Sequence, residues 1–310
     1  MRPDVEIADR RRLIARLAGD YHVNTARRSA RFISRDIVTA LTILAINRAN
    51  VRELLTSREV ITHPHEGIAG VPTDDRRRPV SVYAVAKDLG LPYETIRRRV
   101  RQLVAAGVCA DVDGGLIIPA KVLTDPAHDG IIAETWAATT GFVQEAGRLG
   151  VAAGPPRAAG PDVLRQTLRL TTDFFLESTC HSAKIMDLDV LTVLALRAVN
   201  KANIAHVTHD PELAQAYAGL EEAVPDAQRH PVSVYAIGKF LLLPYETARR
   251  AVKRLEDRGL VERGPDGLTT PTEVLARPEV IRAMIDMAAL TEAFLADLAA
   301  IGVGYRPEAA

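Results

Sequence analysis

Nearly the same phrase occurs twice in this chain: RPVSVYAVAKDLGLPYETIRRRVRQL begins at Arg78, and HPVSVYAIGKFLLLPYETARRAVKRL begins at His230. A shift of 152 positions superimposes residues 79–119, the first motif, on residues 231–271, the second motif, without a gap. About half of the superimposed positions are identical. The chain is therefore an internal duplication, and we expect two similar structural units.

The duplication extends beyond the two motifs. Upstream, with the shift changed by one, DIVTALTILAINRANV from Asp36 matches DVLTVLALRAVNKANI from Asp189. Downstream, each motif is followed by a long stretch with an apolar stripe at helical spacing. The stretch AAGPPRAAGP at 152–161 cannot continue a helix. We place a linker there, between a first unit at 1–151 and a second unit at 162–310.

Each unit is expected to begin with a long helix, at about 7–32 and 161–180, which an apolar helix follows. Irregular segments are expected at 52–77 and 205–229, before the motifs. Segments of this length are long loops for a compact domain and are often functional. The total of 310 residues, of which 47% are hydrophobic, suffices for two domains.

The first motif contains the signals of two short helices and a hairpin. Ser81 is a natural N-cap, and Gly90 ends the first helix before Pro92 opens the second. Apolar residues mark one face of each helix, namely Val82, Val85, Ala86 and Leu89 in the first and Ile96, Val100 and Leu103 in the second. The following VCADVDGGLIIP has two β-prone segments around Asp-Gly-Gly, which predicts a hairpin.

A helix, a three-residue turn, a helix and a hairpin in this order resemble a winged helix-turn-helix. The pattern S-V-x-x-[VI]-[AG]-x-x-L-x-L-P-Y-E-T-x-R-R is similar to the DNA-reading part of bacterial transcription regulators of the MarR, IclR and GntR kind. The resemblance covers about 70 residues per unit. It implies a mainly α fold with small β-hairpin wings, in which two tandem winged-helix domains are flanked by long helices.

Two features depart from this family. The loops before the two motifs are longer than usual, and a regulator of this kind normally carries one such domain per chain and dimerises. Two copies in one chain imply a covalently fused pseudo-dimer, whose leading and closing helices form a core with pseudo-two-fold symmetry. Two recognition helices about 34 Å apart would then read successive major grooves of an imperfect palindrome.

The resemblance also implies which residues contact DNA. The second helix of such a motif enters the major groove, and nearby basic residues contact phosphates. The planar fork of arginine can contact O6 and N7 of guanine together. The expected DNA contacts are Tyr93, Thr95, Arg97, Arg98, Arg101, Arg76, Arg77 and Arg78 in the first unit, and Tyr245, Thr247, Arg249, Arg250 and Lys253 in the second.

The overall charge does not favour DNA, because 39 Lys plus Arg balance 39 Asp plus Glu. The basic residues cluster locally, however: residues 76–107 contain eight basic and two acidic side chains, and residues 229–263 contain eight and four. An Arg-rich helix face is often only a solvated surface. The position of these clusters on the expected face favours DNA contact, more strongly in the first unit than in the second.

Some polar residues allow two interpretations. Two roles fit the asparagines Asn47, Asn50, Asn200 and Asn203. They either make hydrogen bonds that end a helix, or line a ligand groove or the junction between the units. In the second interpretation Arg48 or Lys201 would touch phosphate. Trp136 belongs either to the core or to the wall of a cavity for a small-molecule effector, which regulators of this resemblance commonly bind.

No metal site, cofactor or catalytic set is expected. Two groups have ligand-type side chains at short spacing but do not superimpose between the units: His63, His65 and Glu66, and His206, His209 and Asp210. Cys109, whose counterpart is Val261, is expected at a buried strand position, and Cys180–His181 lacks a partner that would orient a base. No phosphate loop, HExxH or GxSxG motif occurs, so we do not expect an enzyme.

These features predict a transcription regulator that binds specific sequences of double-stranded DNA. No stretch reaches the roughly 18 apolar residues of a membrane span, so we expect a cytoplasmic, nucleoid-associated protein without a membrane partner. A monomeric pseudo-dimer and a homodimer are both compatible with the sequence. The alternative is a winged-helix interaction module that docks a protein through the apolar KFLLLP around Phe240 and Leu242, without sequence-specific DNA binding.

Overall fold

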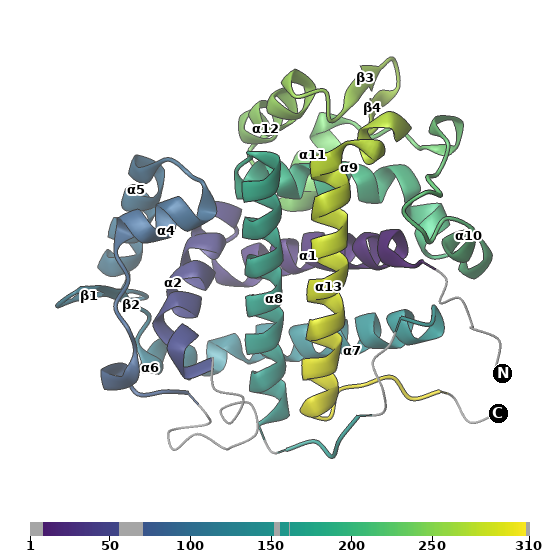
Figure 1. The fold of residues 1–310 in the computed structure, drawn as a ribbon. Helices are drawn as coiled ribbons and strands as arrows, with labels where there is room; N and C mark the ends of the chain where they lie inside the picture. Colours follow the sequence, from purple (N-terminus) through teal and green to yellow (C-terminus); the bar gives the residue numbers. More distant parts are fainter. Residues whose placement is uncertain (1–8, 56–70, 152–155, 161, 308–310) are drawn as a thin grey trace.

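The computed structural model describes residues 9–55, 71–151, 156–160 and 162–307, which are mainly helical with two small antiparallel hairpins (Figure 1). The first unit contains α1 (Arg11–Ile33), α2 (Ile37–Leu55), η2 (Asp74–Arg76), α4 (Val82–Leu89), α5 (Tyr93–Ala105), β1 (Ala110–Val112), β2 (Gly115–Ile117), α6 (Ala120–Leu123), η3 (Pro126–His128) and α7 (Asp129–Arg148). The second contains α8 (Val163–Met186), α9 (Val190–Thr208), α10 (Pro211–Ala216), η4 (Asp226–Gln228), α11 (Val234–Leu241), α12 (Tyr245–Asp257), β3 (Glu262–Gly264), β4 (Gly267–Thr269), η5 (Thr272–Ala276) and α13 (Pro278–Ala300).

The pair of short helices expected in each motif is present. The Ser81 hydroxyl accepts a hydrogen bond from the backbone N–H of Ala84 at 3.1 Å and caps α4, and Ser233 caps α11 in the same way. Gly90 ends α4 in the left-handed conformation at φ 63°. Leu242 ends α11 at φ 53°, a conformation that costs a side chain with a Cβ roughly 1–2 kcal/mol.

Each hairpin is tied to the first residues of its motif. Val80 pairs with Leu116, and Val232 pairs with the equivalent residue of β4, so a short third segment lies beside each two-stranded ladder. The approach is close enough to require glycine. A Cβ on Gly115 would lie 2.7 Å from the oxygen of Val80, and one on Gly267 would lie 2.8 Å from the oxygen of Val232.

The long helices cross from one unit to the other. Helix α1 packs on α9 and α13 of the second unit, and α8 packs on α2 and α7 of the first. Because the repeat equates α1 with α8, α2 with α9 and α7 with α13, these contacts are reciprocal, as in an isologous interface. Figure 1 shows α8 and α13 side by side, with α1 and α7 running across them, and the two hairpins at the left and top of the molecule.

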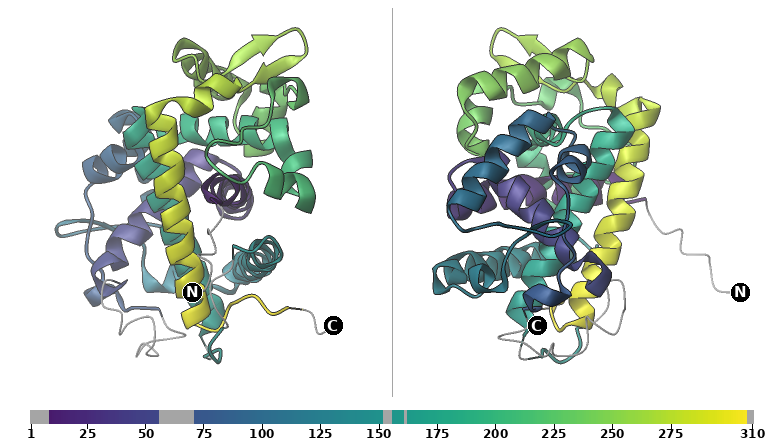
Figure 2. Two further views of the ribbon diagram at one scale, coloured as in Figure 1. Left: turned by 45° about the vertical axis from the view of Figure 1, so that its right-hand side comes forward. Right: turned by 90° about the vertical axis from the view of Figure 1, so that its left-hand side faces the viewer.

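Both main hydrophobic clusters contain side chains of both units. The linker expected at 152–161 therefore separates the two repeats in sequence, whereas their cores are shared. The pairs α4–α5 and α11–α12 lie at the periphery of this shared body, as the view in Figure 2 that faces α4 and α5 shows.

Four aromatic rings meet at the centre, one from each of α1, α7, α8 and α13. The ring centroids of Tyr21 on α1 and Phe142 on α7 lie 4.5 Å apart, and those of Phe174 on α8 and Phe294 on α13 lie 4.3 Å apart. These two pairs are equivalent in the repeat, and Tyr21 approaches Phe174 at 6.3 Å. Aromatic pairs at such distances add about 0.5–1.5 kcal/mol each beyond their buried area. The four-ring cluster therefore fixes the crossing of α1, α7, α8 and α13.

The prediction of an irregular segment at 205–229 is partly wrong, because α9 continues to Thr208 and α10 follows at Pro211–Ala216. Asp210 caps α10 by accepting hydrogen bonds from two backbone N–H groups at 3.0 and 2.9 Å, and proline suits the first helical position. Ala214 is buried against the central cluster. Of the other expected segment, 56–70 lies outside the described residues.

Asn50 and Asn203 join the apolar helices to the motifs. The Asn50 amide donates to the carbonyls of Arg78 and Leu116 at 2.7 and 2.9 Å, and its oxygen accepts from the N–H of Ile118 at 3.0 Å. Asn203 makes the equivalent three bonds in the second unit. Both side chains are buried. They therefore act neither as helix ends nor as a groove lining, but hold each hairpin against its helix.

Asn203→Ala is expected to lower the free energy of unfolding by about 2–5 kcal/mol, because it leaves the His230 carbonyl and the Thr270 N–H without partners, while the Leu268 carbonyl keeps only the N–H of Val232. Asn50→Ala should have a similar effect. The matched control is Asn200→Ala, on the same helix one turn earlier, for which we expect a loss below about 1 kcal/mol. Urea unfolding monitored by circular dichroism measures all three, and equal losses for Asn203 and Asn200 would contradict the assignment.

His22 is fully buried on α1 and contacts the second unit. Its Nε2 lies 3.1 Å from the Ser178 hydroxyl, and Arg197 Nη1 lies 3.2 Å from its Nδ1. Burial and the neighbouring guanidinium lower the pKa of His22 well below its ordinary value of 6.5. The folded protein therefore holds His22 neutral where the unfolded chain would bind a proton.

Acid should consequently destabilise the fold through His22. As pH falls below about 6.5, the unfolded state takes up a proton that the folded state refuses, so the free energy of unfolding falls by up to about 1.4 kcal/mol per pH unit. His22→Phe introduces the residue that Phe175 provides at the equivalent position. The variant should lack this component of the acid sensitivity. Denaturant titrations between pH 7.5 and 5 test it, and identical pH slopes for both proteins would refute it.

Candidate nucleic-acid interface

Helix α5 presents the face that the sequence predicts. Ile96, Val100 and Leu103 are buried beneath it. Tyr93, Arg98 and Arg101 are exposed, and Thr95 and Arg97 are half-buried. The structure therefore brings the expected side chains of this helix together on one surface that points away from the core.

The basic residues of α5 differ in how they are neutralised. Arg97 pairs with Glu94 one turn earlier at 2.7 Å, and this carboxylate raises the pKa of Arg97. Arg99 pairs with Asp36 at 3.0 Å. Arg98 and Arg101 make no ion pair with any residue in the described part of the chain. Their two guanidinium groups are therefore available to an external anion.

Helix α12 presents the equivalent face with less free charge. Arg249 pairs with Glu246 at 3.0 Å, and Lys253 pairs with Asp257 at 2.5 Å. Arg250 is exposed, and its Nε donates to the carbonyl oxygen of Glu246 at 3.3 Å. Tyr245 is exposed and Thr247 is half-buried, as on α5. The two faces are alike in shape but unequal in charge.

The three arginines before the first motif, at 76–78, differ in their exposure to solvent. Arg76 and Arg78 are exposed, whereas Arg77 is buried with only 4% of its surface accessible. Arg77 donates to Asn47 at 3.2 Å and lies 3.8 Å from Asp74. The expected contact between Arg77 and DNA is therefore wrong, because its side chain turns inward at the end of η2.

Sequence reasoning missed one exposed residue in each motif. Tyr83 on α4 and Tyr235 on α11 are 66% and 65% exposed. Tyr83 lines a groove of about 600 Å³ between α4, α5 and the first hairpin, together with Tyr93, Arg97 and Arg101. The available signal was a tyrosine outside the apolar stripe of each short helix, in a chain with only 5% aromatic residues.

The residues expected at a ligand groove or at the junction between the units lie in different parts of the structure. Asn47 and Asn200 each line a cavity, and Trp136 is half-buried against the central cluster. Arg48 forms ion pairs with Asp173 and Glu177 of α8, and Lys201 binds Asp20 of α1 at 2.9 Å. Arg48 and Lys201 therefore connect the units and do not face a phosphate.

The apolar KFLLLP segment is largely covered by this chain. Leu241 and Leu243 are buried, while Phe240 and Leu242 pack half-buried against the shared core. The Arg27 guanidinium of α1 lies over the Phe240 ring at 5.0 Å. The segment is therefore part of the contact between the units.

Among the described residues, no group of three or more His, Cys, Asp or Glu could hold a metal ion. His206 stacks on His230, and His209 lies 3.4 Å from Asp20, while His63, His65 and Glu66 lie outside the described residues. Burial raises the pKa of Cys109 to about 11 and that of Cys180 to about 12, so neither thiol is activated. No described helix is long and apolar enough to cross a membrane.

A scan against protein-family models finds no match for this chain, and searches of curated proteins and of solved structures find no significant match.

Proposed function

We propose that this chain is a transcription regulator that binds specific sequences of double-stranded DNA through two winged helix-turn-helix motifs, residues 79–119 and 231–271. The observation that carries the proposal is the repetition of one exposed helix face, with tyrosine, threonine and arginines at equivalent positions of α5 and α12. In a helix that enters the major groove, such arginines contact base edges or phosphates.

The shared core supports a pseudo-dimeric arrangement of these two motifs. Reciprocal contacts of the long helices are those of an isologous pair, and such pairs read palindromic sites. The unequal charge on α5 and α12 favours two half-sites of different strength, with the stronger one under α5. The covered KFLLLP segment leaves the rival protein-docking function without its main apolar surface.

Selection from a random duplex library tests the proposal, with the wild-type protein compared with Arg98→Ala, Arg101→Ala and Arg250→Ala. We expect an enriched motif with two half-sites, and a loss of about 10- to 100-fold in affinity for a variant that removes a base contact. Loss of a phosphate contact should instead reduce the slope of log K against log salt by about one.

Arg148→Ala is the matched control, because Arg148 is also exposed but lies on α7 and pairs with Glu145. It should leave the affinity within about twofold of wild type. The proposal fails if no sequence is enriched, or if the α5 and α12 variants bind as tightly as this control.

A further inference from the structure

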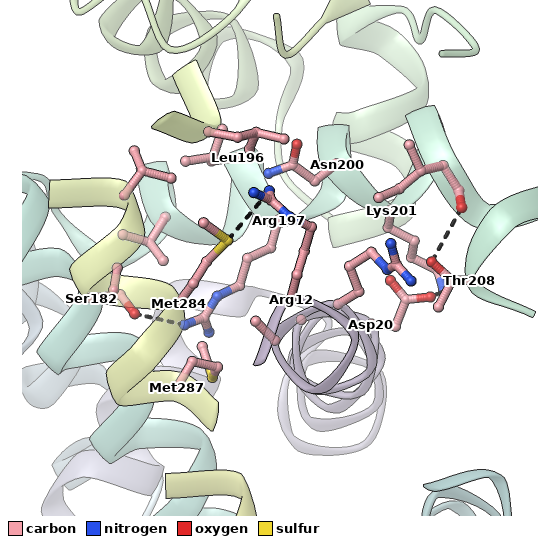
Figure 3. Close-up of a pocket in the computed structure, with 18 of the residues that line it drawn as sticks. Arg12, Asp20, Ser182, Leu196, Arg197, Asn200, Lys201, Thr208, Met284 and Met287 are labelled. Atoms are coloured by element: carbon pink, nitrogen blue, oxygen red, sulfur yellow. Dashed lines mark hydrogen bonds and ion pairs between the residues drawn. The ribbon is translucent and has the colours of Figure 1, made fainter. Parts of the chain in front are cut away.

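A cavity of about 140 Å³ lies between α1 of the first unit and α8, α9 and α13 of the second. Aliphatic side chains form most of its wall, including Leu196, Met284 and Met287 (Figure 3). No residue that lines it is aromatic, and all of them belong to the described part of the chain. Its volume is close to the roughly 150 Å³ of an apolar cavity that binds benzene.

Four arginines line this otherwise apolar space. Arg12 and Arg16 enter from α1, Arg197 from α9, and Arg229 from the residue that follows η4. Burial lowers the pKa of all four, to about 10 for Arg16 and about 9 for Arg197. A buried guanidinium is costly unless an anion or a full set of hydrogen bonds offsets its desolvation.

The arginines find mainly neutral partners in the protein. Arg12 donates to the carbonyls of Gly219 and Leu220, and Arg16 donates to two further carbonyls near α10. Arg197 donates to hydroxyl groups of α8, at 2.8 Å for Thr179. Within the described residues, no carboxylate forms an ion pair with any of these three.

Arg229 has more nitrogens without a hydrogen-bond partner among the described residues than any other of these four arginines. It is 5% exposed, its Nη2 donates to the Val224 carbonyl at 2.9 Å, and its Nε lies 3.3 Å from Asp226. Its Nη1 has no hydrogen-bond partner among the described residues. Arg16 Nε is likewise unpartnered. Buried donors without partners cost about 1–3 kcal/mol each, which an acceptor in the cavity would recover.

The acidic side chains nearby do not fill this role. Asp20 is the one carboxylate that lines the cavity, and both Lys201, at 2.9 Å, and His209, at 3.4 Å, contact it. Figure 3 shows Asp20 and Lys201 to one side of Arg12. Glu221 and Glu222 are exposed, Asp9 pairs with Arg11, and all three act on Arg12 only over a distance. The cavity therefore keeps an excess of positive charge.

The same layout occurs in the first unit. Equivalent positions place Arg165 and Arg169 of α8, Asn47 and Arg77 around a second cavity of about 600 Å³. Arg169 there has its pKa lowered to about 10 by burial and by the neighbouring Arg165 and Arg77. In each unit, therefore, two arginines from the leading helix of the other unit line a cavity beside the motif. The two units share this layout although only about half of their motif positions are identical.

We propose that the cavity of the second unit binds a small organic carboxylate, whose carboxylate group meets Arg229 and Arg16 and whose apolar part, of about six carbon atoms, lies against Leu196, Met284 and Met287. Unbranched methionine side chains adapt to such an occupant. This site is inferred from the cavity alone and does not depend on the DNA-binding proposal.

Hexanoate is the first probe, and calorimetry with the full chain should show saturable binding, which the methionine signals described below assign to this cavity. Hexanamide, which lacks the charge, and acetate, which lacks the apolar part, should each bind at least tenfold more weakly. The chain has four methionines, of which Met186, Met284 and Met287 line the cavity. In the spectrum of protein labelled at the methionine methyl carbons, hexanoate should shift these three signals.

Two variants locate the site. Arg229→Met should weaken hexanoate at least tenfold, whereas the control Arg77→Met, at the equivalent position of the first unit, should leave its affinity within about twofold. Ala283→Ile fills the cavity with the residue that Ile131 provides in the first unit, keeps every charge and should abolish binding.

The proposal is overturned if hexanamide binds as tightly as hexanoate, if Ala283→Ile binds hexanoate like wild type, or if hexanoate leaves the three methionine signals in place. Because these outcomes do not involve DNA, they are distinct from a failure of the library selection. Wild-type affinity in Arg229→Met would overturn the assigned carboxylate contact in the same way.

Discussion

The crossing of α1, α7, α8 and α13 at the four-ring cluster determines where everything else in this molecule lies. Tyr21, Phe142, Phe174 and Phe294 come from four helices that are far apart in sequence, and each ring needs the others to exclude water. The hydroxyl of Tyr21 is satisfied inside this cluster by Thr139 and Thr171 at 2.7 and 2.9 Å. Burial of this polar group is therefore compatible with a dry centre.

From this crossing the arrangement of both motifs follows. Each apolar helix, α2 or α9, packs against the leading helix of both units and carries the asparagine that holds a hairpin in place. The two motif faces are consequently attached to one rigid frame by equivalent hydrogen bonds. Their difference in charge arises from substitutions such as Asp257 on α12, which neutralises Lys253 where α5 has Ala105.

Local signals in the sequence predicted the motifs well, because their causes are local. The Ser81 cap, the turn at Gly90 and the buried stripe of Ile96 are decided within a few residues of each position. The inward turn of Arg77 could not be predicted, since it depends on Asn47 and on a cavity formed by distant helices. The arginines of the cavity in the second unit were missed for the same reason. On α1 alone, Arg12 and Arg16 resemble a solvated face, and only the crossing of the units buries them.

Fusion of the two repeats in one chain has a consequence for how the molecule behaves on dilution. An isologous pair of separate subunits dissociates as its concentration falls, and each subunit then exposes its half of the core. Here the partner of α1 is supplied by the same polypeptide, so the effective concentration of one unit near the other is independent of how many copies a cell contains. The shared core therefore forms equally well at very low and at high protein concentration. The two units can also diverge in sequence, because each always packs against the other unit of the same chain.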